Sequence, residues 1–331
     1  MRKPALSAAG LAIAVILPVV LNEAFYQHIL ITSGINIILA VSLGIIVGYL
    51  GELSLGHGAF YGIGAYTSAL LTLKLGIPFP AAFLLAILFS GLMGYLIGIP
   101  ALRFSGHYFA IATLGFQGIV ILLIINLVDL TRGPMGLPGI PGPGELTIGA
   151  FTISFQDKIP YFYLTLFVVI VVLYLTRNLM RFRYGRAFIA TREDPMLAAS
   201  IGVEPRKYRM LAFTISTAMA GAAGSLYAHY ALFISPDSFH LPESIYLATM
   251  VIVGGRGTIA GPVIGALVLT AAPEVLRSAG SFQFVLYGLI LMIVVVFFPK
   301  GIIGLFTKYK KNESDNNEIP SAAVNHGTPE S

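Results

Sequence analysis

Long apolar stretches alternate with short polar ones along most of this 331-residue chain. Most of the stretches approach the roughly 20 residues with which a helix crosses a bilayer, although the third and eighth are short. The pattern therefore predicts an all-α polytopic membrane protein with about 8–10 transmembrane helices. The stretches cover approximately residues 5–21, 29–50, 58–73, 79–98, 108–128, 160–176, 210–232, 244–253, 259–276 and 282–298.

Composition supports this prediction. Apolar residues make up 56% of the chain and charged residues 11%, and the mean hydropathy is +0.85, which overrules the two soluble domains suggested by length alone. The net charge of +5 comes from basic residues in short loops, so it does not indicate nucleic-acid binding. We expect a transmembrane domain over residues 1–307 and a disordered polar tail over 308–331.

Charge also predicts the orientation. Residues 177–209 contain eight of the twenty Lys and Arg but only three acids, so the positive-inside rule places this loop in the cytoplasm. Basic residues near both ends of the chain place the termini on the same side, which requires an even number of crossings. We interpret 5–21 as a retained helix rather than a cleaved signal, because it is long for a signal and lacks a clear cleavage site.

The basic loop contains the signals of a short helix. Asp194 is a good N-cap, and Pro195 is favoured at the first helical position because its missing N–H needs no partner. Gly202 supplies the residue that commonly follows a helix end. The predicted helix has about two turns and is largely apolar, so it is too short to be stable unless it packs against something.

Glycine clusters interrupt two apolar stretches, at positions 48–64 and 254–257. They predict broken or re-entrant segments and an internal repeat. Two interpretations remain open: the glycines border a translocation path, or they allow close helix packing. The path candidates are Glu52, Gly56, His57, Gly58, Gly254, Gly255 and Gly257.

Ionisable residues inside apolar stretches are functional candidates, since a lipid-facing charge costs at least about 2.5 kcal/mol. Glu52 and His57 qualify, although a helix cap and a hydrogen bond to a neighbouring carbonyl explain them equally well. Glu274 is better explained as facing water at a loop. The spans thus offer few fixed charges, which favours a zwitterionic solute over a metal ion.

Residues 129–160 form the largest predicted external loop. Pro and Gly recur every two or three residues from Thr131 to Pro143, which predicts that this part is not helical. Alternating apolar positions from Leu146 to Phe155 predict a small β-hairpin.

The sequence gives little support for catalysis. It has no GxxxxGK[ST] segment to cradle a phosphate, no cysteine, and no histidines at metal-binding spacing. Ser54 and Ser105 lie near histidines but lack the orienting acid and elbow turn of a hydrolase. We therefore expect no enzyme activity, no metal and no cofactor in this chain.

Four blocks in a fixed order resemble a known family. They are Gly51–Gly58, Tyr108–Leu114, Arg192–Gly202 and Gly254–Thr258, and the resemblance runs from about Asn36 to Gly301. Together they resemble the M-type permease subunit of ATP-binding-cassette (ABC) importers for branched-chain amino acids. The resemblance implies a bacterial plasma-membrane location with both termini cytoplasmic. It implies as partners a second homologous permease subunit, two ATPase subunits that bind ATP and Mg²⁺, an extracytoplasmic solute-binding protein, and membrane lipid.

The resemblance also implies roles for residues. Contact with the ATPase falls to Arg192, Glu193, Asp194, Pro195, Met196, Leu197, Ala198, Ala199, Ile201 and Gly202. The external loop faces the binding protein in this family, and its docking candidates are Thr131, Arg132, Gly133, Gly136 and Leu137. Two alternatives remain: a related importer for urea or short amides, and an ion-gradient-driven amino-acid carrier that uses Glu52, His57 or Glu274.

Overall fold

The computed structural model describes residues 23–148, 151–155, 157–276 and 301–304, together with isolated positions at 15, 17–18, 282, 288–289 and 292. The predictions for the first and last apolar stretches, the total number of crossings, the termini and the tail after residue 307 lie outside the described residues.

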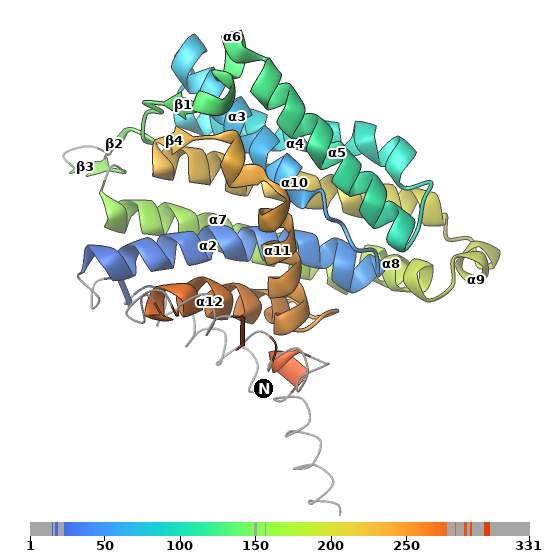
Figure 1. Ribbon diagram of the computed structural model, residues 1–331. Coiled ribbons are helices and arrows are strands. Elements are labelled where there is room, and N and C mark those ends of the chain that lie inside the picture. The colour runs from blue at the N-terminus through green and yellow to red at the C-terminus, as the bar shows by residue number, and fades with distance from the viewer. Residues whose placement is uncertain are drawn as a thin grey trace, which may run out of the picture.

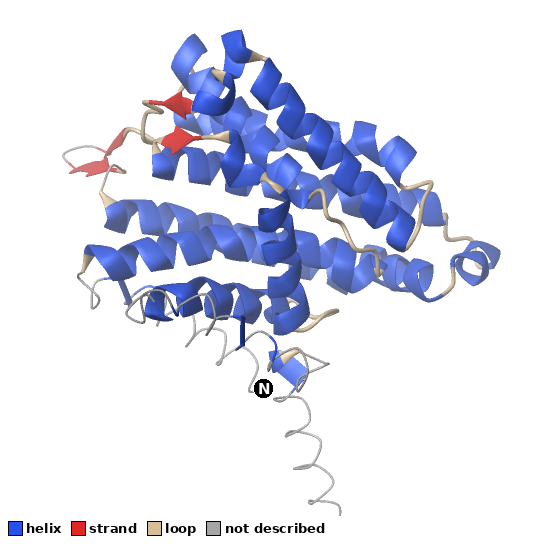
Figure 2. Ribbon diagram, in the orientation of Figure 1, coloured by secondary structure: helices blue, strands red, loops and turns tan. Residues whose placement is uncertain are grey.

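Helices account for nearly all of the described chain, and the strands are short (Figure 2). This confirms the predicted all-α membrane fold. The elements are α2 (Ala24–Gly44), the π-helical turn η1 (Ile45–Leu50), α3 (His57–Leu75), α4 (Phe79–Ala101), α5 (His107–Asn126), α6 (Val128–Thr131), η2 (Gly133–Met135), β1 (Leu137–Pro138), β2 (Glu145–Ile148), β3 (Phe151–Ser154), α7 (Lys158–Arg181), α8 (Arg183–Glu193), α9 (Pro195–Ser200), α10 (Pro205–Ala231), β4 (Phe233–Ile234), η3 (Pro236–Phe239), α11 (Leu241–Gly254) and α12 (Ala260–Val275).

Five helical segments of the described chain are long and apolar enough to cross a membrane. They are α2 with η1, α4, α5, α7 and α10, and α12 is a shorter apolar helix. These segments and α12 lie roughly side by side, whereas α11 crosses them at a steep angle (Figure 1). The apolar stretch 244–253, which is short for a spanning helix, lies in α11, a 14-residue helix oriented differently from the spanning ones.

The bundle has two distinct ends. At one end, which we call the basic end, lie α8 and α9 and the start of α10; at the other, the strand end, lie all four β-strands (Figure 1). The ion pair between Glu52 and Arg209 joins elements at the basic end. At the strand end, Lys158 Nζ donates to the Ala24 carbonyl at 2.9 Å. The long helices extend between these two ends (Figure 1).

Small residues bring α3 and α10 into contact at the centre of the bundle. A Cβ atom added to Gly64 would overlap the Gly221 backbone, and one added to Gly224 would overlap the Tyr61 carbonyl. Ser90 of α4 donates to the Thr217 carbonyl of α10 at 2.9 Å. For these glycines, close helix packing is therefore the interpretation that the structure supports.

The strand-end loops are partly as predicted. β2 and β3 form the expected antiparallel hairpin, with Glu145 opposite Ser154. The prediction that 131–143 is not helical is wrong at its start, because α6 ends at Thr131 and η2 forms one 3₁₀ turn. Arg132, with a left-handed backbone (φ 59°), ends α6, and the 3₁₀ turn η2 begins at the next residue. The pairing of β1 with β4 was not predicted.

Candidate functional site

The predicted short helix in the basic loop is present as α9. The Asp194 carboxylate accepts hydrogen bonds from the backbone N–H groups of Met196 and Leu197, at 2.8 and 3.0 Å. Pro195 occupies the first turn. Gly202 follows with φ +85°, the left-handed conformation expected of a residue after a helix end.

Helix α9 presents apolar side chains to the surface of the chain. Met196 is 85% exposed and Ile201 is 73% exposed, and Leu197 is exposed between them. Only Ala198 of this helix packs inward. In Figure 1, α9 lies at the extreme tip of the basic end. A compact apolar tip of this kind, beside charged neighbours, is typical of a protein interaction site.

Two arginines attach the loop that carries α9 to the bundle. Arg192 Nη1 donates to the Gly48 carbonyl of η1 at 2.9 Å. Arg209 forms a 2.7 Å ion pair with Glu52 and also donates to the Phe104 carbonyl at 2.9 Å. Displacement of α9 would therefore act directly on η1 and on the turn between α4 and α5.

The structure places Glu52 in this attachment. Its carboxylate accepts hydrogen bonds from Arg209 and from the backbone N–H of Gly106, the latter at 2.8 Å. Glu52 also borders a cavity of about 360 Å³, which Arg192 and Pro195 line as well. Glu52 thus combines an ion pair with Arg209 and a hydrogen bond from Gly106, the N-cap residue of α5.

The two glycine-rich breaks meet at the basic end. A Cβ atom added to Gly48 would lie 2.8 Å from the backbone nitrogen of Gly257, so the two segments approach to backbone contact. Gly254 packs equally closely against the Gly261 carbonyl. This contact between the two breaks was not predicted from the sequence, and Gly254, Gly255 and Gly257 border neither described cavity.

The segment after the first break is fully packed. His57 Nε2 lies 2.7 Å from Ser42 Oγ, so its partner is a hydroxyl rather than the carbonyl considered from the sequence. The Gly58 N–H donates to Ser244 Oγ at 2.9 Å. Ser244 in turn donates to Gln117 Oε1 at 2.9 Å, which joins α3, α5 and α11 in one buried network. Gly56 packs against the Thr113 backbone.

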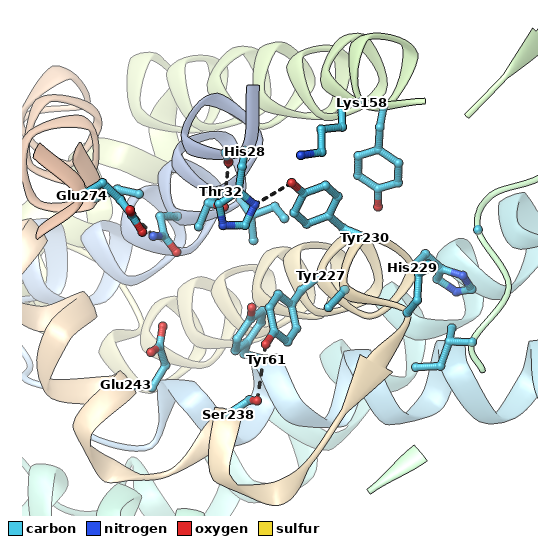
Figure 3. A pocket seen from close by; sticks show the side chains of 18 of the residues that line it. His28, Thr32, Tyr61, Lys158, Tyr227, His229, Tyr230, Ser238, Glu243 and Glu274 are labelled. Carbon is cyan, nitrogen blue, oxygen red and sulfur yellow. Dashed lines mark hydrogen bonds between the residues drawn. The ribbon is translucent and has the colours of Figure 1, made fainter. Parts of the chain in front are cut away.

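A cavity of about 1080 Å³ opens toward the strand end, between α2, α7, α10, α11 and α12. Figure 3 shows its labelled polar side chains arranged around one space. His28 Nδ1 lies 2.6 Å from the Tyr230 hydroxyl on one wall, and Glu243 of α11 lies on the opposite wall. This size suits a small organic solute.

Sequence reasoning missed this cavity. Most of its acids and bases lie near the ends of apolar stretches, where loops are expected, and only Glu274 among them had been considered for ion coupling. Lys158, His28 and Glu243 line the same cavity only through the tertiary arrangement, because they are far apart in the sequence. The one available signal was Glu243, which directly precedes the short apolar stretch 244–253.

The strand-end docking candidates differ in exposure. Thr131, Gly133, Gly136 and Leu137 are buried, and Leu137 pairs with Ile234 of β4. Thr131 Oγ1 donates to the Leu127 carbonyl at 2.8 Å. Arg132 alone of the five is exposed. Four of these residues therefore shape the loop, and Arg132 is available at its surface.

A bundle of helices long and apolar enough to cross a membrane, with a solute-sized cavity and an exposed apolar tip, is typical of an integral membrane transport component. The chain belongs to the family described as branched-chain amino acid transport system / permease component, whose model matches residues 25–298.

Named relatives agree with this assignment. The chain is 34% identical over 313 residues to the high-affinity branched-chain amino acid transport system permease protein LivM of Escherichia coli (strain K12), covering 89% of this chain and 73% of the relative. It is 29% identical over 283 residues to LivH of the same organism, covering 81% and 90%. The autoinducer 2 import system permease protein LsrC of Yersinia pseudotuberculosis (strain YPIII) is 29% identical over 265 residues, covering 78% and 68%. These relatives are transport permeases rather than enzymes.

Proposed function

We propose that this chain is one of two unlike membrane subunits of an ATP-driven importer for branched-chain amino acids, located in the bacterial plasma membrane. Its relatives named LivM and LivH support both the substrate class and the pairing of two permeases. The basic end then faces the cytoplasm and the strand end faces the solute-binding protein.

The observation that carries the proposal is the exposed apolar tip formed by Met196, Leu197 and Ile201. Each of two partner ATPases would cover such a tip, one per permease subunit. Closure of the ATPases on ATP would push α9, and Arg192 would pass this displacement to η1 through its bond to Gly48. The helical bundle would rearrange in response.

A substitution in α9 tests the coupling. Ala199→Asp places a charge on the exposed tip, and an unpaired charge buried in an interface costs about 2–5 kcal/mol. Gly202→Val strains the left-handed residue that ends the helix. We expect ATP-dependent leucine uptake by the reconstituted complex to fall by about tenfold or more with either variant, while membrane insertion is unchanged.

The matched control is Lys207→Gln, which lowers the charge of the same loop by one unit. Lys207 is exposed, and its ion pair among the described residues is with the exposed Glu204, at 3.6 Å, so its loss should leave uptake near the wild-type rate. Normal uptake by Ala199→Asp would contradict the proposal.

The two alternatives predict different results. An ion-driven carrier would concentrate amino acid in vesicles that contain this chain alone under a proton or sodium gradient. An importer of urea or short amides would take up those solutes, and calorimetry of the partner binding protein would show an amide rather than leucine as its ligand.

A further inference from the structure

The cavity at the strand end has two chemically different walls. Lys158 and His28 stand on one side, near the start of α7 and in α2, and Glu243 stands on the other, in the first turn of α11 (Figure 3). A solute that crosses this space meets the basic groups together with Glu274 on one wall and the Glu243 carboxylate on the other (Figure 3).

The basic wall is already hydrogen-bonded within the protein. Lys158 Nζ donates to the Ala24 carbonyl at 2.9 Å, and His28 pairs with the Tyr230 hydroxyl at 2.6 Å. Glu274 also borders the cavity and is engaged in an interaction of its own.

The Glu243 carboxylate differs from these groups. It is partly buried, and no hydrogen-bond donor or cation among the described residues contacts it. A carboxylate withdrawn from bulk water without a partner is costly, so its retention is best explained by a cationic ligand. In Figure 3 the carboxylate points into the cavity.

The backbone that carries Glu243 is held in place. Ser244, the next residue, is fully buried and bonds both Gln117 of α5 and the Gly58 N–H of α3. The carboxylate therefore has a fixed base on the buried network, as a binding group requires.

Aromatic rings complete the surroundings of the carboxylate. Tyr61 and Tyr227 border the cavity with their ring centroids 5.5 Å apart, and Phe239 packs edge-on against Tyr61 at 5.0 Å. Tyrosine faces attract ammonium groups through their quadrupoles. The same rings offer apolar surface to an aliphatic side chain.

We infer that Glu243 receives the α-ammonium group of the transported amino acid in this cavity, and that the tyrosine wall accepts its aliphatic side chain. This inference deepens the proposed function and rests on it. Glu243 is then one of the few fixed charges that the sequence allows in the spans. Carboxylic acids without an amino group would gain nothing from Glu243 and would be selected against inside the membrane, after the binding protein has released them.

Binding to the nucleotide-free complex, reconstituted in detergent without its binding protein, tests this role. The probes are leucine, 3-methylbutylamine, which keeps the ammonium group, and 4-methylpentanoate, which lacks it. We expect saturation-transfer NMR to show that the wild-type complex binds the two amines at least tenfold more tightly than 4-methylpentanoate. Glu243→Gln should abolish this preference, and Glu243→Asp should retain most of it.

Glu23→Gln is the matched control, because Glu23 is exposed near the same end and does not border the cavity. Unchanged elution and thermal unfolding of Glu243→Gln show that it is folded. Equal binding of leucine by wild type and folded Glu243→Gln would overturn the inference, as would equal wild-type binding of leucine and 4-methylpentanoate. Failure of the wild-type complex to import leucine with ATP would instead refute the proposed function, since amine binding is measured separately.

Discussion

Gly64→Val is expected to destabilise the bundle severely. A Cβ atom at position 64 would overlap the Gly221 carbonyl oxygen and Cα of α10, and backbone atoms cannot move aside as a flexible side chain can. Overpacking typically lowers stability by about 1–3 kcal/mol. Because this substitution would push two central helices apart, we expect a loss of about 3 kcal/mol or more. Heating of the detergent-solubilised protein, followed by size-exclusion chromatography, should show a midpoint lowered by several degrees or more.

Gly118→Val in α5 is the matched control. It makes the same substitution inside an apolar helix, but no atom lies within 4 Å of the added Cβ. Its unfolding midpoint should remain close to that of the wild type. Equal stability of the two variants would show that α3 and α10 do not approach as closely as described.

Glu52→Ala is expected to be the second severe variant. It leaves the Arg209 guanidinium, whose side chain is only 17% exposed, with the Phe104 carbonyl as its remaining acceptor. Removing one partner of a buried ion pair costs about 3–5 kcal/mol, whereas replacing both by apolar groups is often nearly neutral. The double variant Glu52→Leu/Arg209→Leu should therefore be more stable than Glu52→Ala in the same heating experiment.

The exposed ion pair between Glu204 and Lys207 provides the comparison for this prediction. Its side chains lie in the same loop at 3.6 Å but are largely in water, so Glu204→Ala should cost less than about 1 kcal/mol. Measurements of uptake should distinguish the effect of the ion pair on stability from its effect on transport. The folded double variant is expected to lose ATP-dependent transport, because α10 is no longer joined to Glu52 at the end of η1.

Local signals in the sequence predicted the local structure. The cap at Asp194, the proline after it and the glycine at 202 define α9 within one residue, because each acts through its own backbone geometry. The alternation from Leu146 likewise predicted the hairpin of β2 and β3. The long helices were predictable from the length of the apolar stretches, since a segment in lipid must satisfy its backbone hydrogen bonds internally and a helix does so.

The candidate site was less predictable, because its contacts join distant segments. Glu52 and Arg209 are 157 positions apart, and nothing in the sequence near either one specifies the other. For the glycine clusters the sequence left two interpretations open; in the structure Gly48 and Gly254 lie in close backbone approach and border neither described cavity. The charges of the strand-end cavity were assigned to loops because periodicity carries no information about which helix ends converge.

Helix α10 has a consequence for how signals cross the membrane. Its 27 residues form a rod of about 40 Å, which is anchored near its start by Arg209 and continues beyond its end into β4, paired with β1. A tilt imposed at one end of α10 would be carried to the other, because the helix is continuous from Pro205 to Ala231. In the proposed importer, docking of the binding protein at the strand end and closure of the ATPases at the basic end would thus both change the tilt of α10.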